Sequence, residues 1–182
     1  MIITITGKPC SGKGVVTQYL IERYGFEKFS GGEIFRRIAT ERGIDILELN
    51  RLHDTSIDRL VDEEIVKIGE RDLHKNIIFD SRTAWHFIPK SFKVFLDISS
   101  DEQARRLITS GRTTEKVELT QEEAEKSLNE RWNLENNRYQ EIYGFDNRDL
   151  NQYDLVVDTT NITIDEVGET IYREYLKYIE NK

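Results

Sequence analysis

The sequence predicts an α/β fold in which helices cover both faces of a five-stranded parallel sheet. Short runs rich in β-branched and aromatic residues alternate with longer segments of helical periodicity, and several short runs are almost continuously apolar. Such apolar runs are typical of parallel strands, because these are buried on both faces. The 182 residues include no internal repeat and no linker rich in glycine or proline, so we expect a single domain over 1–182.

Each element has a basis in the sequence. The expected strands are 2–6, 27–30, 77–80, 93–97 and 155–158. Helices are expected to begin near Lys13, Gly32, Asp45, Ile57, Asp101, Gln121 and Ile164. For the last of these helices, Thr163 and Glu166 form a capping box, in which each satisfies a backbone N–H of the other. Because the carboxyl ends of parallel strands meet at one edge of a sheet, we expect Gly7, Ser30 and Asp80 to lie beside one ligand.

The composition is that of an acidic protein with a mixed charged surface. Asp and Glu number 34 against 26 Lys and Arg, which gives a net charge of −8. This balance argues against a nucleic-acid partner, since neutralising a phosphate backbone requires a basic surface. Cys10 is the only cysteine, so no internal disulfide forms and a cytoplasmic location is expected. No apolar run approaches the ~20 residues that span a bilayer. We expect no membrane partner, and a monomer or a homodimer.

A glycine-rich turn follows the first expected strand. Its sequence GKPCSGKG, at 7–14, has the spacing of the P-loop or Walker A pattern G-x-x-x-x-G-K-[ST]. In such a loop the backbone N–H groups and a helix N-terminus face the phosphates, and the lysine adds positive charge. The residues expected to bind ATP are therefore Gly7, Pro9, Cys10, Ser11, Gly12, Lys13, Gly14 and Val15. An ordinary turn between strand and helix is the alternative.

The last position of this pattern departs from its usual residue. Gly14 stands where a Ser or Thr hydroxyl would bind magnesium. The stretch resembles the loop G-x-P-x-x-G-K-G of the nucleoside monophosphate kinases, which carry glycine there. The resemblance implies that Mg²⁺ is held by the ATP phosphates and by waters anchored on carboxylates elsewhere, with no direct protein ligand. Val15 departs from that family's Thr or Ser, which implies weaker ATP binding at this position.

Two further stretches resemble acceptor-binding elements of these kinases. In FSGGEIFRR, at 29–37, Ser30, Gly32 and Arg36 fit the element S-x-G-[DE]-x-x-R, whose arginine holds the acceptor's phosphate. A capped surface helix with solvated charges is the alternative for this stretch. In IIFDSRTAWHFIP, at 77–89, Asp80 and Arg82 resemble the D-G-R or E-G-R element of cytidylate kinases. A carboxylate at such a strand end can anchor a magnesium-bound water or a phosphate-binding arginine.

The second stretch leaves the preferred base open. Ser81 replaces the glycine of the family element, and Thr83 replaces an aspartate that reads cytosine in bacterial cytidylate kinases. The shorter, archaeal-type cytidylate kinases also lack that aspartate. Two interpretations stay open for the aromatic run Trp85, His86 and Phe87. These side chains line a base pocket, or they belong to the core, as Trp and Phe more often do.

The segment 109–140 resembles the lid of the same kinases. Its first part, TSGRTTEKVELT at 109–120, is polar and rich in turn-forming residues. In RWNLENNR, Arg131 and Arg138 match the two arginines of the cytidylate kinase element R-[DE]-x-x-[DE]-S-x-R, whereas Trp132 and Asn136 depart from it. The two arginines are two helical turns apart and so can face one side. An amphipathic helix with solvated arginines is the alternative.

Phosphoryl transfer needs positioning and positive charge rather than covalent chemistry. The residues expected to be catalytic are Lys13, Arg131 and Arg138, with Arg105 or Arg112 as additional cations. The acceptor-binding segment is expected at about 31–70. Asp58 and Asp62 lie there, one turn apart, and are expected on a solvated face, with contact to the acceptor or its arginine as the alternative. The stretch YDLVVDTTNITIDEV at 153–167 resembles the last strand and helix of cytidylate kinases, which implies that the turn at 159–161 lies near the adenine of ATP.

Along the whole chain the resemblance is closest to short, archaeal-type cytidylate kinases. It implies a P-loop kinase fold and transfer of the γ-phosphoryl group of ATP, with Mg²⁺, to a nucleoside monophosphate, for which we expect CMP or dCMP. A P-loop kinase for another nucleotide or small molecule is one rival, and a nucleotide-binding sensor without turnover is another. Five cations of these motifs are intact and weigh against the sensor: Lys13, Arg36, Arg82, Arg131 and Arg138.

Overall fold

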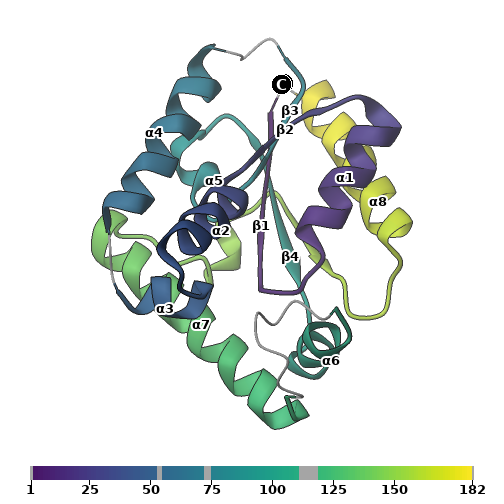
Figure 1. The fold of residues 1–182 in the computed structure, drawn as a ribbon. Coiled ribbons are helices and arrows are strands. Elements are labelled where there is room, and N and C mark those ends of the chain that lie inside the picture. The colour runs from purple at the N-terminus through teal and green to yellow at the C-terminus, as the bar shows by residue number, and fades with distance from the viewer. Residues whose placement is uncertain (1, 53–54, 72–74, 111–118, 182) are drawn as a thin grey trace.

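A computed structural model describes residues 2–52, 55–71, 75–110 and 119–181 (Figure 1). All five expected strands are present and confirm the α/β class; they are β1 (Ile2–Gly7), β2 (Glu27–Ser30), β3 (Ile77–Asp80), β4 (Phe92–Asp97) and β5 (Leu155–Asp158). The α-helices of the described residues are α1 (Lys13–Tyr24), α2 (Gly31–Arg42), α3 (Ile46–Arg51), α4 (Thr55–Arg71), α5 (Ala84–Phe87), α6 (Ser100–Ser110), α7 (Gln121–Tyr143) and α8 (Ile164–Glu180).

The strands form one parallel sheet in the order β2-β3-β1-β4-β5. Its register aligns the carboxyl ends that the sequence assigned to a common site. Ser30 pairs with Asp80 between β2 and β3, and Asp80 pairs with Ile5 between β3 and β1. Gly7 therefore ends β1 just beyond Asp80, and the expected proximity of Gly7, Ser30 and Asp80 is confirmed.

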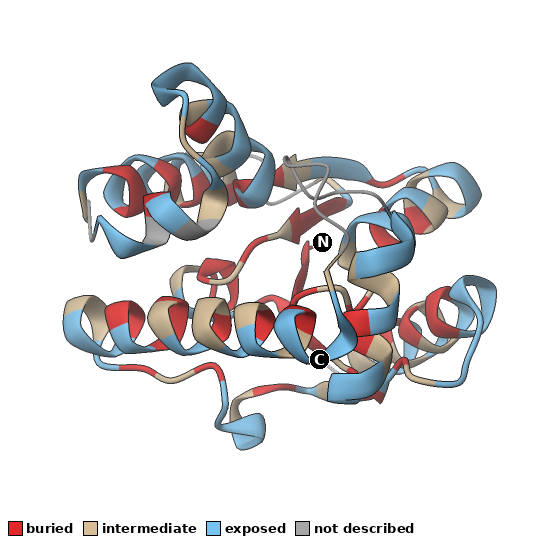
Figure 2. Ribbon diagram, turned by 60° about the horizontal axis from the view of Figure 1, so that its bottom comes forward, coloured by how far each residue is buried: buried red, intermediate tan, exposed pale blue. Residues whose placement is uncertain are grey.

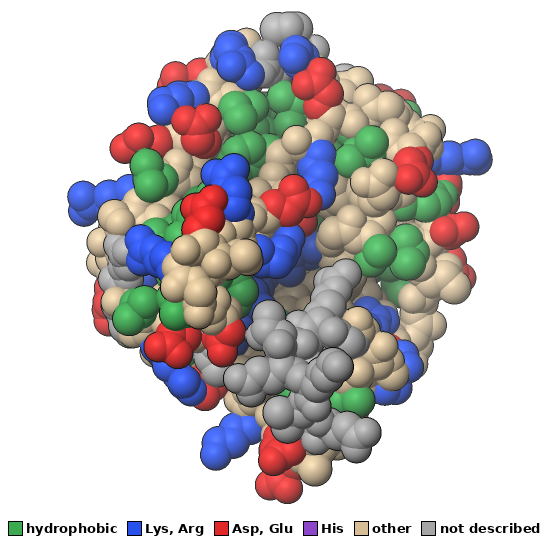
Figure 3. Space-filling model, in the orientation of Figure 1, with side chains coloured by type: hydrophobic (Ala, Val, Ile, Leu, Met, Phe, Trp, Pro, Cys, Tyr) green, Lys and Arg blue, Asp and Glu red, His purple; other side chains and the backbone are tan. Residues whose placement is uncertain are grey.

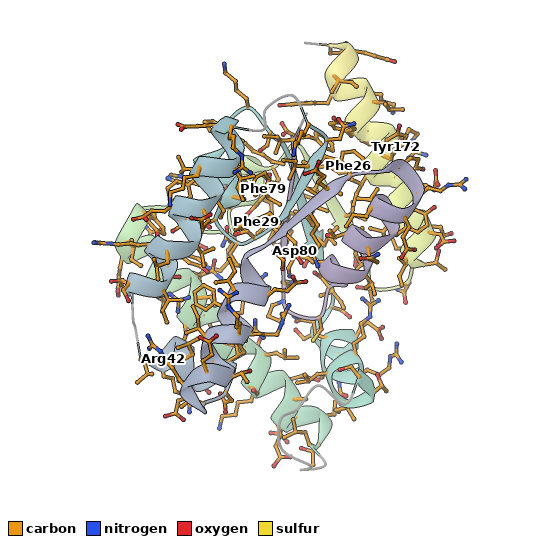
Figure 4. All side chains as sticks on the ribbon, turned by 45° about the horizontal axis from the view of Figure 1, so that its top comes forward. Phe26, Phe29, Arg42, Phe79, Asp80 and Tyr172 are labelled. Atoms are coloured by element: carbon orange, nitrogen blue, oxygen red, sulfur yellow. The ribbon has the colours of Figure 1, made fainter. Side chains whose placement is uncertain are left out.

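Helices cover both faces of the sheet, as the sequence predicts. On one face α1 and α8 pack over β1 and β4, and Phe26 belongs to this core. On the other face α4 and α5 pack over Phe79 of β3, and Phe29 packs against the same cluster. Figure 4 shows Phe26 beside Tyr172 of α8, with Phe29 and Phe79 on the side of α4. Figure 2 shows the buried residues along the strands and the inner sides of the helices.

The helix N-termini differ in how they are capped. α7 and α8 each begin with a capping box, formed by Thr120 with Glu123 and by Thr163 with Glu166, and the second of these confirms the prediction. α1 is preceded instead by Gly12, which offers no side-chain cap, and its first turn contains no acidic residue. The first turn of α1 is therefore left open to an external anion.

Two short elements were not predicted from the sequence. They are α5 and a 3₁₀-helix at Leu150–Gln152. Each is too short to show a helical period in its apolar residues, so the pattern could not identify them. In the described part of the chain, no helix has the length and apolar character to cross a membrane.

Candidate active site

The glycine-rich loop connects β1 to α1 through an unusual backbone path. Gly7 and Gly12 have φ of 148° and 91°, and Cys10, although it carries a side chain, has φ of 59°. A Cβ on Gly7 would lie 2.3 Å from the carbonyl oxygen of Leu96. Only glycine therefore allows β1 to end so close to β4 and turn into the loop.

The loop offers backbone donors to an anion. In the described part of the chain, the N–H groups of Gly12, Lys13 and Gly14 donate to no acceptor, whereas the next regular helical hydrogen bond runs from Val16 N to Gly12 O at 3.0 Å. Consecutive open N–H groups at a helix N-terminus favour a phosphate. Val15, the residue that departs from the family pattern, is 46% exposed at this end of α1.

The carbonyls of the loop are held from the opposite side by α6. Gln103 is buried, and its Nε2 donates to the carbonyl of Pro9 at 2.7 Å. Arg106 donates from Nη1 to the carbonyl of Cys10 at 3.3 Å. Because these carbonyls are already used, the loop is fixed with its donors available to a ligand.

Lys13 folds back over the loop. Its Nζ donates to the carbonyls of Gly7 at 3.0 Å and Lys8 at 3.1 Å. Burial, followed by the charge of Arg82, lowers the pKa of Lys13 to about 7, while Asp80 acts in the opposite direction. A phosphate beside this ammonium would favour its charged form. Figure 3 shows Lys and Arg side chains gathered near the middle of this face.

Glu135 of α7 joins two arginines at the centre of the site. Its Oε2 accepts from Arg82 Nε at 2.6 Å and its Oε1 from Arg131 Nε at 2.8 Å. Burial alone would raise its pKa, but the two guanidinium groups hold the pKa of Glu135 at about 2. Arg82 also donates to the carbonyl of Gly7 and lies over the ring of Trp132, 5.2 Å from its centroid. The structure thus brings Lys13, Arg82 and Arg131 together.

Arg138 lies in a different part of α7's buried side. It is 3% exposed and pairs with Asp58 of α4, which is 2% exposed, at 2.8 Å between Nε and Oδ2. Its guanidinium lies 5.8 Å from the ring centroid of Phe35 on α2. The expectation that Asp58 faces solvent is wrong, because the carboxylate is needed to compensate the buried guanidinium.

Asp62, one turn further along α4, is also buried rather than solvated. Its Oδ1 accepts from the hydroxyl of Thr83 at 2.6 Å, and its Oδ2 accepts from the hydroxyl of Tyr143. Burial raises the pKa of Asp62 against the influence of these hydrogen bonds. The expectation of a solvated face is therefore wrong for this residue too, since both oxygens are occupied by internal donors.

The start of α2 carries the residues expected to hold the acceptor's phosphate. Ser30 caps the helix by accepting from Glu33 N at 3.3 Å. Gly32 and Arg36 are exposed on this helix, and a Cβ on Gly32 would lie 3.5 Å from Nη1 of Arg36. The structure places Ser30 beside the end of β3, and Arg36 one turn beyond Gly32.

Asp80 lies between the loop and the acceptor region. In Figure 4 it occupies the middle of the view, between α1 and α2. Its Oδ2 is 4.0 Å from the position that a Cβ on Gly14 would take, and its charge acts on Lys13. In the described residues, no three His, Cys, Asp or Glu side chains cluster as a metal site. A carboxylate close to Lys13 is suited to hold a metal-bound water rather than the metal itself.

Arg106 of α6 contacts the loop, whereas the sequence analysis expected its neighbour Arg105 as an additional cation. It contacts the loop at Cys10, and its Nη2 donates to the carbonyl of Thr159 at 2.7 Å. Arg105, expected as an additional cation, instead pairs with Glu102 at 2.6 Å on the exposed side of α6. The helical phase identifies the correct arginine, because Arg106 lies one turn after the buried Gln103. Thr159, expected near the adenine, donates from its hydroxyl to the carbonyl of Ser11 at 3.1 Å.

The aromatic residues after Arg82 divide between core and surface. Trp85 is buried in a cluster with Phe95 and Tyr153, and His86 is exposed. Phe87 lines a pocket of about 400 Å³ between α4 and the end of α7, together with Arg59, Asp62, Glu63, Val66, Lys67 and Tyr143. Of the expected lid, residues 111–118, which include Arg112, lie outside the described residues.

An open parallel sheet with a glycine-rich loop at the end of β1, and cations gathered beside it, defines the class of P-loop kinases. Solved structures share this fold. A protein from Eubacterium ventriosum covers 100% of this chain and 99% of its own at a TM-score of 0.71 and 16% identity. A shikimate kinase from Acinetobacter baumannii covers 97% of this chain and 93% of its own, at a TM-score of 0.61 and 16% identity. At these identities the likeness concerns the fold alone.

The chain belongs to the cytidylate kinase-like family, whose model matches residues 2–161. Two similar relatives are cytidylate kinases of archaea. The one from Methanothermobacter thermautotrophicus is 36% identical over 161 residues, 87% of this chain and 95% of the relative. The one from Sulfurisphaera tokodaii is 32% identical over 183 residues, 98% and 97% of the two chains. The resemblance identified from the sequence motifs is thereby confirmed.

Proposed function

We propose that this protein transfers the γ-phosphoryl group of ATP to CMP or dCMP and releases ADP and the nucleoside diphosphate. Its family supports an ATP-dependent nucleoside monophosphate kinase. The observation that carries the proposal is the charge cluster at the end of β1, where Lys13 lies among Arg82, Arg131, Asp80 and Glu135. Such a cluster suits a reaction in which negative charge spreads over a moving phosphoryl group.

The residues then have distinct roles. ATP binds along the loop from Gly7 to Val15, with Lys13 on its terminal phosphates. Arg131 and Arg138 of α7 stabilise the transferring group and the bound acceptor. The acceptor lies against Ser30, Gly32, Arg36, Asp80 and Arg82. No general base is required, because a phosphate monoester is already ionised near neutral pH, with a second pKa of about 6.

Mg²⁺ fits this arrangement through water. When bound, it neutralises charge on the ATP phosphates. Asp80, at the end of β3 and near Gly14, is the residue that would anchor its waters, because the loop presents glycine in place of a hydroxyl. We place no protein atom directly on the metal.

The proposal treats 1–182 as one kinase domain, with an acceptor-binding segment at about 31–70 and a lid at about 109–140. A lid is required because water must be excluded from the transferring phosphoryl group. The protein would act in the cytoplasm on small nucleotides, as a monomer or homodimer, with neither nucleic acid nor membrane as partner.

The test is ADP release from ATP and Mg²⁺ with a panel of acceptors: CMP, dCMP, UMP, AMP, GMP, dTMP and none. Strong turnover with CMP or dCMP is expected. Turnover with another monophosphate alone would replace the acceptor and keep the mechanism. No turnover with any acceptor, by a protein that still binds ATP, would refute the kinase proposal.

Lys13→Ala should abolish turnover without unfolding the protein, because the ammonium serves the phosphates. Initial rates with CMP measure the loss, and circular dichroism with thermal unfolding verifies the fold. Lys67→Ala is a suitable control, since Lys67 is an exposed lysine of α4 that pairs with Glu64 at 2.9 Å. An active, folded Lys13→Ala protein would contradict the assignment of the loop.

A further inference from the structure

The carbonyl groups of the glycine-rich loop are held by side chains from two other parts of the chain. They come from α6 and from the turn that follows β5, and Figure 1 shows α6 beside the turn from β1 into α1. Three consecutive carbonyls are held in this way. The contacts join Gln103 Nε2 to Pro9 O at 2.7 Å, Arg106 Nη1 to Cys10 O at 3.3 Å and Thr159 Oγ1 to Ser11 O at 3.1 Å.

A held carbonyl also fixes the N–H group of the same peptide. In a planar trans peptide, the C=O of one residue and the N–H of the next point in opposite directions. The hydrogen bond from Gln103 to Pro9 therefore turns the N–H of Cys10 away from α6. Backbone N–H groups that successive residues turn to one side form a concavity that binds anions. The direction of this peptide thus bears on phosphate binding.

The peptide between Pro9 and Cys10 has a conformation that needs support from elsewhere. Cys10 has φ of 59°, in the left-handed region that residues with a side chain seldom occupy. Rotation of this peptide would return φ of Cys10 to negative values and reverse the direction of its N–H. Such conformations persist where surrounding contacts hold them. Gln103 is 5% exposed and supplies such a contact.

Gln103 and Arg106 differ in what they can contribute to the loop. Arg106 is charged, and it divides its donors among Glu102 Oε1 at 2.7 Å, Thr159 O at 2.7 Å and the loop. Gln103 is neutral, so it adds no charge beside a phosphate. Any effect of Gln103 on a bound phosphate must therefore pass through the position of the loop.

We propose that Gln103 is a positioning residue of the phosphate-binding loop, which holds the Pro9 carbonyl so that the N–H of Cys10 is presented to the phosphates of ATP. Gln103 itself touches neither nucleotide. The inference rests on the part of the proposed function that assigns ATP to this loop. It concerns the phosphates alone, so binding of the adenine and of the acceptor nucleotide does not depend on Gln103.

Gln103→Met tests this role, because it removes the donor and keeps a side chain of similar size. Titration calorimetry measures the Kd for ATP with Mg²⁺ and for CMP. Competition against ATP measures the Kd for pyrophosphate, which can contact the loop but carries no adenine. The Kd values for ATP and pyrophosphate should rise by the same factor, about tenfold, the value of one hydrogen bond to a charged group. The Kd for CMP should stay unchanged.

Gln121→Met is the matched control. Gln121 Nε2 also donates to a backbone carbonyl of α6, that of Asp101 at 2.9 Å, but on the exposed surface. Its removal should leave all three Kd values unchanged. Gln103→Asn is a second variant in case Gln103→Met does not fold. It keeps an amide on α6 but ends one carbon–carbon bond short of Pro9, so it should also weaken ATP and pyrophosphate and spare CMP. Thermal unfolding verifies the fold of each variant.

Unchanged Kd values for ATP and pyrophosphate in a folded Gln103 variant would refute the positioning role. A loss confined to ATP would refute it too, because the effect would then lie at the adenine, and so would an equal loss for CMP. These measurements need no turnover. A wild-type protein that binds ATP but phosphorylates no monophosphate would refute the proposed function and leave this inference standing, whereas one that binds neither ATP nor pyrophosphate would refute both.

Discussion

At the scale of single residues, the site consists of cations that are already paired with buried carboxylates. Arg82 and Arg131 share Glu135, and Arg138 pairs with Asp58. Each guanidinium is therefore held in place by the protein, and little reorganisation is left for the moment of phosphoryl transfer. The pairing also explains how several like charges can be held inside a stable protein.

Lys13 makes ATP binding depend on pH. Its pKa of about 7 lies below the ordinary value because of burial and of Arg82, so the ammonium loses its proton as the pH rises above 7. Phosphates bind the protonated form, and the apparent Kd for ATP with Mg²⁺ should rise by up to about tenfold per pH unit above pH 7. Titration calorimetry between pH 6 and 9 measures this slope.

Lys13→Arg provides the comparison for that titration, because a guanidinium stays charged over the whole range. Its Kd should be nearly independent of pH, whatever its absolute value. An identical slope in both proteins would assign the pH dependence to another group and contradict the lowered pKa of Lys13.

The residue scale is also where sequence analysis failed. Asp58 and Asp62 stand in SIDRLVDEE among other charges, and the pattern gives no reason to bury them. Their burial depends on Arg138 and on Thr83, which reach α4 only in the folded chain. Arg106 was missed for a related reason, because its place one turn after Gln103 is informative only once Gln103 is known to be buried.

At the scale of elements, α7 is the helix that organises the cations. It carries Arg131, Glu135 and Arg138 at intervals of three or four residues, which places them along one side. Glu135 also connects this helix to Arg82, which follows β3. The helix therefore depends on its own carboxylate to stay docked against the end of the sheet.

Glu135→Gln should destabilise the protein by about 3 kcal/mol at neutral pH, because it removes a buried carboxylate that compensates two part-buried arginines. The folded pKa of Glu135, about 2, is below its value in the unfolded chain. Its contribution is therefore fully present above pH 4.5 and is lost as the pH falls toward 2. Urea unfolding at pH 7 and pH 3 measures the difference between the proteins, which should shrink at pH 3.

Glu130→Gln is the matched control on the same helix. Glu130 pairs with Arg51 at 2.7 Å, but its side chain is 39% exposed. A surface pair of this kind contributes about 0–1 kcal/mol, so the control should differ little from the wild type. Equal losses from both substitutions would show that Glu135 has no special structural role.

Most elements were predictable because their apolar residues repeat with a clear period. The strands at 27–30, 77–80 and 155–158 have the expected bounds, and each expected helix begins within two residues of its place. The exceptions, α5 and Leu150–Gln152, are single turns stabilised by contacts from elsewhere, such as that of Trp85 with Asn147. Such contacts leave no periodic pattern in the sequence.

At the scale of the whole molecule, the layer formed by α1 and α8 depends on one close approach. A Cβ on Gly168 of α8 would lie 2.3 Å from Cδ1 of Tyr19 on α1. Gly168→Ala should therefore lower the free energy of unfolding by about 1–3 kcal/mol through overpacking, even though alanine favours a helix. Chemical denaturation measures this loss, and a Tyr19→Ala background should remove most of it. An unchanged stability would contradict the close packing.

The whole molecule also combines an acidic net charge with a local cluster of cations beside Lys13. A net charge of −8 repels extended polyanions, while the arginines beside Lys13 attract a small one. This distribution favours mononucleotides over nucleic acid as ligands, in keeping with the proposed function.

The uncapped start of α1 has one more consequence. α7 and α8 carry their own acidic caps, whereas the first turn of α1 has neither a side-chain cap nor an acidic residue. Glu123 and Glu166 accept hydrogen bonds from backbone N–H groups at the starts of α7 and α8. A bound phosphate would accept the corresponding hydrogen bonds at the start of α1. The amides of Gly12 to Gly14 should then exchange with deuterium quickly in the free protein and slowly with ATP, while the first turn of α8 stays unchanged. Hydrogen exchange at the start of α1 would thus measure whether ATP occupies the loop.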